Sequence, residues 1–539
     1  MTRSLTPIAI ASALLSVGSA TLLGAPVAQA ARPAVVQQQQ EAPQSPELIR
    51  RGAKRSFAIR TWHGMRRMVE FPTQIQHVVV IDMENRSVDD IFAAYWGHSW
   101  QKSNTVEWQN VMNIANPAGP PALTPNPLST AAAYSFDPNH EHDGGFLNET
   151  LNGFGSETFG CSAMPCPPNA TAYSYVPIPG ADPYAQLAQN YASADEVFQA
   201  NEGPSMPSHQ YLIAGQTGGI PGSFTYPLAI ASNPGSKNTQ GNYLETGDPD
   251  GGKMSAYCAG GTQPKAPALN MTTGRQPAFT TSYQAIQPPC ETYTSGTILD
   301  EMVTNQGTPP YDDWQYVGHQ IGGFWSAPTA VANLYAQYTQ GNVNTQPFAI
   351  DPNAYNFVQS LQGTGNPQRP FATLTYITPC SNTSDHPSAS GSKDYGPQWL
   401  GTVVNAIGTS RYWSSTAIIV TWDDWGGFYD HVPFVESAHN PYGNPADPNE
   451  WGFRVPFIVI SPYVSSVGYV SHGPGGTLGN PTPRSQSAIL TFIETIFDLP
   501  SLKTDDSAND NLLDMFNFNN FVPFTPVTGL SSYQIPSTC

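Results

Sequence analysis

Four short stretches of the chain are apolar, rich in β-branched residues, and lack the alternation of a strand that has one face in water. They are residues 75–81, 372–377, 416–421 and 455–460. Continuous apolar runs of this length are typical of strands covered on both faces of a sheet. The sequence therefore predicts four buried strands.

Helical periodicity occurs between and after these runs. The expected helices are residues 182–192, 206–215, 351–362, 398–407 and 488–497. Strands that are separated by helices favour an α/β fold with a largely parallel sheet.

The N-terminus has the pattern of an export signal. Arg3 is followed by an apolar stretch over residues 8–23, and small residues at 27–30 offer a cleavage site. We expect a Sec-type signal peptide over residues 1–30 and a secreted or periplasmic protein that begins near Ala31. No later stretch is apolar enough to span a bilayer.

The remaining chain has no clear internal linker. Residues 31–70 contain a glutamine run and a basic patch, and we expect them to form a poorly ordered N-terminal arm. Residues 71–539 are expected to form one large domain. Within it, residues 220–290 are rich in Gly, Pro, Asn and Thr, which predicts a long surface excursion.

Composition and charge narrow the possible partners. Only 11% of the residues are charged and the net charge is −19, against roughly 25% charged residues in an average domain. A weakly charged, acidic chain of this kind argues against nucleic acid as a partner. Its polar surface suits an extracellular protein.

Six cysteines follow the predicted signal: Cys161, Cys166, Cys258, Cys290, Cys380 and Cys539. Disulfides are the default in an oxidising compartment, and metal binding by these thiols is the less favoured alternative. Cys161 and Cys166 are close enough to close a small loop. A bond between Cys258 and Cys290 would staple a Gly-rich segment.

Polar residues follow three of the predicted strands. They are residues 82–87 (DMENRS), 385–386 (DH) and 422–427 (WDDWGG). Ligands of open parallel sheets bind beyond the carboxyl ends of the strands. Each cluster alone could simply cap a helix or shape a turn. Together, their carboxylate, amide and imidazole groups suit a divalent cation or a phosphate.

Ser205 begins an apolar helical stretch after Gly203-Pro204. A serine at a helix N-terminus lies among free backbone N–H groups at the positive end of the helix dipole, a position that receives phosphate and stabilises an alkoxide. The alternative for Ser205 is a plain N-cap.

Four blocks of sequence resemble the bacterial phosphoesterase family that contains phospholipases C and acid phosphatases. They are residues 75–87 (IQHVVVIDMENRS), 421–432 (TWDDWGGFYDHV), 452–462 (GFRVPFIVISP) and the terminal helix at 488–500. The resemblance implies an alkaline-phosphatase-like α/β core, a mostly parallel sheet flanked by helices, and long loop insertions. It makes residues 71–539 a phosphoesterase domain that acts through a phosphorylated Ser or Thr.

The resemblance also implies roles for single residues. One divalent metal ion, of unspecified identity, or the phosphate would be held by Glu84, Asn85, Asp423 and Asp424. Ser205 would be the nucleophile, and His140, His319 and His386 would act on the phosphoryl group. His142 is an alternative to His140, and an ordinary structural role is the alternative for His319. Asp430 and His431 belong to the second block as residues that orient its loop.

The chain departs from the family pattern in two places. After the nucleophile the family commonly has Pro-Asn-Arg, whereas this chain has Pro207-Ser208-His209. An acid-histidine pair often precedes the terminal helix, where this chain has Ser485-Gln486. We expect both changes to bear on leaving-group preference.

The resulting hypothesis is a secreted phosphoric-ester hydrolase with a phosphoserine intermediate. The resemblance leaves acid phosphatase and phospholipase C both open, so the substrate is a small phosphate ester or a phospholipid headgroup. A non-catalytic secreted surface or binding protein on the same scaffold is the rival hypothesis. Retention of Ser205 together with the strand-end acids favours the enzyme.

Overall fold

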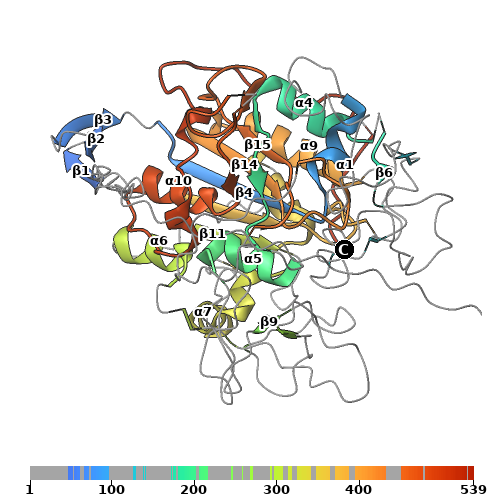
Figure 1. The fold of residues 1–539 in the computed structure, drawn as a ribbon, viewed down its shortest axis with the longest axis horizontal. Helices are drawn as coiled ribbons and strands as arrows, with labels where there is room; N and C mark the ends of the chain where they lie inside the picture. The colour runs from blue at the N-terminus through green and yellow to red at the C-terminus, as the bar shows by residue number, and fades with distance from the viewer. Residues whose placement is uncertain are drawn as a thin grey trace, which may run out of the picture. The chain divides into compact units, whose positions relative to one another are not determined.

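The computed structural model (Figure 1) describes the following residues: 47–51, 54–60, 66–71, 74–95, 126–128, 137–138, 140, 172, 174–177, 180–201, 205–216, 244–246, 258, 268–270, 290, 292–293, 296–306, 314–318, 325–340, 348–363, 371–387, 395–432, 451–477, 480–530 and 532–539. The predicted signal peptide, Cys161, Cys166, His142 and His319 lie outside the described residues. Predictions about them stay predictions.

An eight-stranded sheet forms the centre of the described chain. From edge to edge its strands are β12 (Phe348–Ile350), β11 (Trp314–Gly318), β13 (Leu374–Thr378), β4 (His77–Met83), β14 (Thr416–Trp422), β15 (Phe457–Ile460), β7 (Ala192–Ala194) and β16 (Tyr469–Ser471). Only β15 is antiparallel to its two neighbours; the other neighbouring pairs are parallel. The predicted α/β fold with a mostly parallel sheet is confirmed.

The four strands predicted from sequence are β13, β4, β14 and β15, which lie side by side in this sheet. Every residue of β14 is buried, as is every residue of β4 after His77. Val80 of β4 pairs with Tyr376 on one side and Ile419 on the other. Burial on both faces explains why these runs are continuously apolar.

Helices flank the sheet. They include α4 (Asp182–Asn190), α5 (Ser205–Ala214), α6 (Ile298–Gln306), α9 (Tyr395–Gly408) and α10 (Ala488–Phe497). α4 packs against α9 and β15, whereas α5, α6 and α10 pack against one another. Figure 1 shows α4 and α9 on one side of the central strands and α5 and α10 on the other.

Four of the five predicted helices are α4, α5, α9 and α10. The fifth prediction, residues 351–362, is divided into a 3-10 turn, η7 (Pro352–Ala354), and α8 (Tyr355–Leu361). Asn353 and Ala354 have φ values of 56° and 55°, and this left-handed backbone breaks the helix.

The remaining helical elements are α1 (Val88–Phe92), α7 (Ala332–Gln340), η1 (Ala93–Tyr95), η6 (Ala327–Ala330), η8 (Trp413–Ser415), η9 (Asp505–Ala508) and η10 (Leu513–Met515). Small sheets pair β8 (Val197–Phe198) with β17 (Arg484–Ser485), β5 (Asn126–Pro127) with β6 (Ser174–Tyr175), and β9 (Leu244–Thr246) with β10 (Ala268–Asn270).

Three antiparallel strands, β1 (Glu47–Arg51), β2 (Lys54–Arg60) and β3 (Arg66–Phe71), lie in the stretch expected to be an arm, apart from Phe71. They belong to a compact unit that runs from Pro43 to Cys539. The domain boundaries themselves stay predictions.

Two disulfides join described cysteines. Cys258 is bonded to Cys290, within the predicted surface excursion, and Cys380 is bonded to Cys539. The second bond ties the C-terminal residue to the loop that follows β13. Among the described helices, none has the length and apolar character needed to cross a membrane.

Candidate functional site

The loops that follow β13, β4 and β14 are joined by backbone hydrogen bonds. Glu84 N donates to Ser384 O at 2.7 Å, Arg86 N donates to Asp424 O at 3.0 Å, and Asp423 N donates to Met83 O at 2.9 Å. The three strands are parallel neighbours, so these loops leave the same edge of the sheet. The polar clusters that follow the three predicted strands therefore share one edge of the sheet.

Asn85 turns the first of these loops. Its φ of 53° places it in the left-handed region, which asparagine tolerates better than most residues. Its backbone N–H donates to Asp423 Oδ1 at 2.9 Å. The turn directs its side-chain amide toward the loop after β14.

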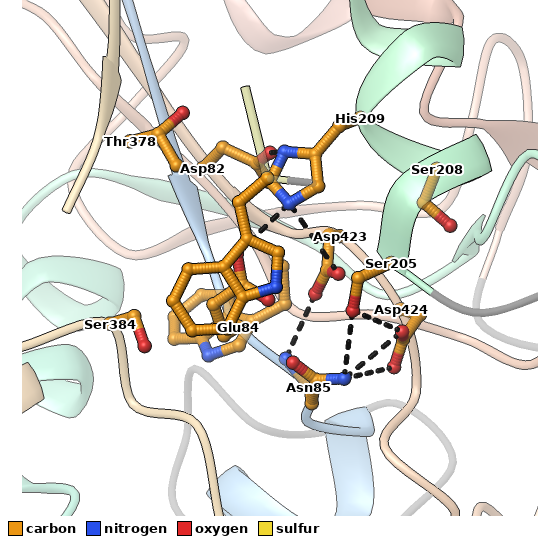
Figure 2. A network of polar contacts seen from close by, with 12 residues as sticks. Asp82, Glu84, Asn85, Ser205, Ser208, His209, Thr378, Ser384, Asp423 and Asp424 are labelled. Carbon is orange, nitrogen blue, oxygen red and sulfur yellow. Dashed lines mark hydrogen bonds and ion pairs between the residues drawn. The ribbon is translucent and has the colours of Figure 1, made fainter. Parts of the chain in front are cut away.

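Ser205 is the first residue of α5 and is buried. Its hydroxyl donates to Asp424 Oδ2 at 3.2 Å and accepts from Asn85 Nδ2 at 3.2 Å. Asn85 Nδ2 also lies 3.2 and 3.1 Å from the two oxygens of Asp424. Figure 2 shows the three side chains closing a triangle of polar contacts.

His140 extends this triangle. Its Nδ1 lies 2.8 Å from the carbonyl oxygen of Pro138, which can only accept, so the ring proton is on Nδ1. Its Nε2 then accepts from Asn85 Nδ2 at 2.9 Å. His140 Nε2 is 3.9 Å from Asp424 Oδ2. The first predicted histidine therefore lies beside Ser205.

His386 faces His140, with ring centroids 6.3 Å apart. Trp325 also packs against the ring of His386, at a centroid distance of 5.5 Å. Burial lowers the pKa of His386, and the nearby Asp137 only partly offsets it. Two of the predicted histidines thus stand together at the site.

The structure adds two residues that the sequence did not assign to the site. His209 Nδ1 is 2.6 Å from Asp82 Oδ2, and His209 Nε2 is 3.0 Å from Glu84 Oε1. His209 Nε2 is also 3.8 Å from Asp423 Oδ2. Its position four residues after Ser205 puts both side chains on one face of α5 and was the available signal. Nothing in the sequence pointed to Asp82 as its partner.

Burial has the largest effect on the pKa values of Asp82 and Glu84. It raises the pKa of Glu84 well above the usual carboxyl range, and the nearby Asp423 raises it further. It also raises the pKa of Asp82 to about 6, although His209 pulls the value down. For His209, burial would lower the pKa, but Asp82 and Glu84 outweigh it and raise the pKa well above its ordinary value.

The four predicted metal or phosphate residues divide into two pairs. Asn85 and Asp424 contact Ser205, whereas Glu84 and Asp423 face His209 (Figure 2). Within the described residues, buried Glu84 Oε2, Asn85 Oδ1 and Asp423 Oδ2 have no hydrogen-bond partner. Unsatisfied buried oxygens of this kind fit a cation-binding site.

Ser208 and Gln486, which belong to the two departures from the family pattern, make structural contacts. Ser208 accepts from Gln199 Nε2 at 3.1 Å and donates to Asn201 Oδ1 at 2.9 Å. Gln486 accepts from Ala200 N at 3.1 Å and donates to Asp423 O at 3.2 Å. Both side chains hold residues 199–201, which follow β8, in place.

Asp430 and His431 lie in a buried ion-pair network rather than at Ser205. Arg454 Nε contacts Asp430 Oδ1 at 2.8 Å, and Arg454 Nη2 contacts Asp89 Oδ1 at 3.4 Å. His431 Nδ1 lies 2.8 Å from Asp89 Oδ2. The network links the loop after β14 to α1, in agreement with an orienting role.

Sequence comparison finds similar stretches in plant phospholipases. The chain is 40% identical to non-specific phospholipase C4 of Arabidopsis thaliana over 142 residues, which cover 24% of each protein. It is 38% identical to non-specific phospholipase C1 of the same plant over 128 residues, which cover 22% of each. The chain thus spans about a quarter of the length of these curated relatives.

Among solved structures, a protein in the alkaline phosphatase superfamily from Vibrio parahaemolyticus aligns with 62% of this chain and 64% of its own, at 11% identity and a TM-score of 0.30. A TM-score of this size does not establish a shared fold. The model of the Phosphoesterase family, in contrast, matches residues 75–500, a range that includes all three strand-end loops, Ser205 and α10. On that match, the chain belongs to the phosphoesterase family.

Proposed function

We propose that this chain is a phosphoric ester hydrolase of the phospholipase C type, with Ser205 as the nucleophile. Family membership and the similarity to plant phospholipases C support a phospholipid headgroup ester as the substrate. The observation that carries the proposal is the contact of the Ser205 hydroxyl with both Asp424 and Asn85.

The first step is attack of Ser205 Oγ on phosphorus. Asp424, which already accepts a hydrogen bond from this hydroxyl, is placed to take its proton. Asn85 donates to the same oxygen, and the N-terminus of α5 favours negative charge there. These three features stabilise the alkoxide and orient its attack.

His140 and His386 would hold the non-bridging phosphoryl oxygens in this proposal; His140 Nε2 can donate to them once the ring takes up a second proton. As the bond between phosphorus and the leaving oxygen breaks, one of the two histidines gives the leaving oxygen a proton. Water then attacks the phosphoserine and gives a proton back to that histidine. The bond from phosphorus to Oγ breaks, and Ser205 regains its proton from Asp424.

Glu84, Asn85, Asp423 and Asp424 would hold a divalent cation next to this serine. A bound cation would stabilise the serine alkoxide and neutralise charge on the phosphoryl oxygens. The unpartnered oxygens of Glu84 and Asp423 support this assignment.

The test compares Ser205→Ala with Ser208→Ala. Ser208 lies in the same helix but contacts Gln199 and Asn201 instead of Asp424. We expect Ser205→Ala to lose hydrolysis of p-nitrophenylphosphorylcholine at least about a thousandfold, as loss of a nucleophile does elsewhere. Ser208→Ala should retain it, and acid-quenched wild type should carry phosphate on Ser205 by mass spectrometry.

Parallel assays on p-nitrophenyl phosphate separate the two substrate classes. If p-nitrophenyl phosphate is turned over faster than p-nitrophenylphosphorylcholine, the activity is that of a phosphatase and not that of a phospholipase C. Full activity of Ser205→Ala would refute the nucleophile. A folded wild-type protein that turns over neither ester would favour the non-catalytic alternative.

We also propose that the protein is exported and that residues 1–30 are removed. The disulfides Cys258–Cys290 and Cys380–Cys539 support an oxidising compartment. N-terminal sequencing of the protein recovered outside the cytoplasm should begin at Ala31. Recovery of uncleaved protein in the cytoplasm alone would contradict export.

A further inference from the structure

His209 of α5 lies between two carboxylates, Asp82 near the end of β4 and Glu84 directly after that strand. One ring nitrogen faces Asp82 Oδ2 at 2.6 Å, and the other faces Glu84 Oε1 at 3.0 Å and Asp423 Oδ2 at 3.8 Å. The side chains of these four residues are at most 4% exposed.

We infer that His209 Nε2, Glu84 and Asp423 bind one divalent transition-metal ion, with Asp82 orienting the imidazole. One ligand atom from each of the three residues lies within 4.8 Å of the others. Ligands that are each about 2.0–2.2 Å from a shared ion have mutual separations in this range. Small side-chain movements would therefore suffice to bring all three onto one ion.

Two oxygens support a cation at this point independently of the histidine. Glu84 Oε2 and Asp423 Oδ2 are buried and have no hydrogen-bond partner among the described residues. A buried carboxylate oxygen without a partner is costly. An ion held between Glu84 and Asp423 would satisfy both.

The contact with Asp82 is the kind that supports a metal-bound histidine. Histidine ligands usually donate their second ring N–H to a carboxylate, which fixes the tautomer and the ring orientation. His209 Nδ1 donates a hydrogen bond to Asp82 Oδ2 in this way. That bond leaves His209 Nε2 facing Glu84 and Asp423. Asp82 is therefore a positioning residue and not a ligand.

A nitrogen ligand changes which ions the site prefers. Oxygen-only sites suit Ca²⁺ and Mg²⁺, whereas imidazole with carboxylates suits Zn²⁺, Co²⁺ and related ions. The arginine that the family commonly has at the position of His209 has no lone pair to offer a metal. The histidine thus gives this chain a ligand set that the resemblance does not imply.

The inference rests on the proposed function and deepens it: the ion is the one cation assigned to the strand-end loops, and His209 Nε2 joins Glu84 and Asp423 as a ligand. Its competing interpretation is that a protonated His209 supplies the positive charge itself, in place of a metal ion. The two interpretations differ in whether the purified protein binds metal through imidazole.

The experiment uses the exported full-length protein, freed of metal by chelation and titrated with Co²⁺. Visible absorption reports binding, and X-ray absorption reports nitrogen ligands. We expect wild type to bind a single equivalent with an imidazole signal. Asp82→Asn should weaken binding by about 10–100-fold, the usual effect of removing such a partner. His209→Gln should weaken it by at least about 100-fold and remove the imidazole signal.

His472→Gln is the matched control, because His472 also pairs with an aspartate, Asp195, at 2.8 Å. It should bind Co²⁺ as wild type does. His209→Arg restores the family's residue and a permanent charge; it should remain folded by circular dichroism, bind Co²⁺ at least about 100-fold more weakly than wild type, and give no imidazole signal. It therefore tests the site even where His209→Gln fails to fold.

The inference is overturned if wild type binds none of Co²⁺, Zn²⁺ and Mn²⁺, or binds Co²⁺ with no imidazole signal. Unchanged affinity in folded His209→Gln or His209→Arg would overturn it as well. Ser205→Ala keeps the three ligands, so it should bind Co²⁺ while losing hydrolysis. Failure of the metal site and failure of the proposed nucleophile are therefore distinguishable.

Discussion

Gly426 lies directly against the backbone of Asn85. A Cβ atom at Gly426 would be 2.2 Å from the carbonyl oxygen of Asn85 and 2.6 Å from its carbonyl carbon. Gly426 also has a φ of 66°, and its N–H donates to Asp424 Oδ1 at 2.7 Å. The position of Asp424 relative to Asn85 therefore depends on a residue that has no side chain.

We expect Gly426→Ala to reduce both stability and activity. The positive φ alone costs an alanine about 1–2 kcal/mol, and the clash must also push the loops after β4 and β14 apart. Ester hydrolysis should fall by about tenfold or more, because small displacements of catalytic groups are costly. Steady-state assays and thermal melts measure both effects.

Gly475→Ala is the control for that variant. Gly475 has a similar φ of 71°, but nothing lies within 4 Å of a Cβ built there. It should show the backbone cost without the loss of activity. Equal behaviour of the two variants would mean that the contact with Asn85 is unimportant.

Gln486→Glu should damage the site without touching the substrate. The amide of Gln486 donates to Asp423 O, and its oxygen accepts from Ala200 N. A carboxylate cannot donate, so it would face carbonyl oxygens in a fully buried position. We expect a loss of about 1–3 kcal/mol in the free energy of unfolding and a lower kcat.

Denaturant unfolding and kinetics test this prediction, with Gln362→Glu as the control. Gln362 is exposed at the end of α8, so its change should stay within about 0.5 kcal/mol. Wild-type stability of Gln486→Glu would contradict the role assigned to the amide.

His472 should make stability depend on pH. The hydrogen bond to Asp195 raises the pKa of His472 above its usual value, although burial opposes it. Its folded pKa is higher than its unfolded pKa, so the stabilisation is full below about pH 6.5 and is lost as the pH rises through the folded pKa.

We therefore expect His472→Gln to be less stable than wild type by about 0.5–1 kcal/mol at about pH 5.5, as for a partly exposed ion pair. The difference should disappear at about pH 9. Urea unfolding at both values measures it. If the stability difference between wild type and His472→Gln grew as the pH rose, the predicted direction of the pH dependence would be wrong.

Glu494→Gln should stabilise the protein at neutral pH. Burial raises the pKa of Glu494 to about 10, and the nearby Asp506 contributes further. The folded state therefore keeps a proton that the unfolded state releases above about pH 4.5, so wild-type stability falls as the pH rises from there. Glutamine has no such loss and can still accept from Leu502 N, as Glu494 Oε1 does at 3.1 Å.

The gain for Glu494→Gln should exceed about 1 kcal/mol near pH 7.5, since one pKa unit corresponds to about 1.4 kcal/mol. At about pH 4 the two proteins should be equally stable. Unfolding curves at both pH values decide the matter, and a variant less stable than wild type at pH 7.5 would contradict it.

The fold was partly predictable because buried strands have a local signature. The runs that became β13, β4, β14 and β15 were apolar throughout, and four of the five helices had clear periodicity. The strands β7, β16 and β12 have only three residues each. Three residues contain no periodic signal, and such strands form only because a neighbouring strand already presents its edge. An apolar run also has no direction, so the antiparallel β15 could not be inferred.

The site was also predictable only in part. The motifs after the strands placed Glu84, Asn85 and Asp424 at one edge of the sheet, and the family resemblance selected Ser205. The structure then separated the predicted ligands into one pair at Ser205 and another at His209. That division depends on side-chain directions, which spacing along the chain does not contain.

The sequence by itself determined the four long apolar strands, most of the long helices, the family and the residue types available for chemistry, since each is encoded in local periodicity or a short motif. Only the tertiary structure decided which atoms meet. His209 and Glu84 are 125 positions apart along the chain. Their contact arises because packing of α5 against the sheet brings a helix face onto the end of β4.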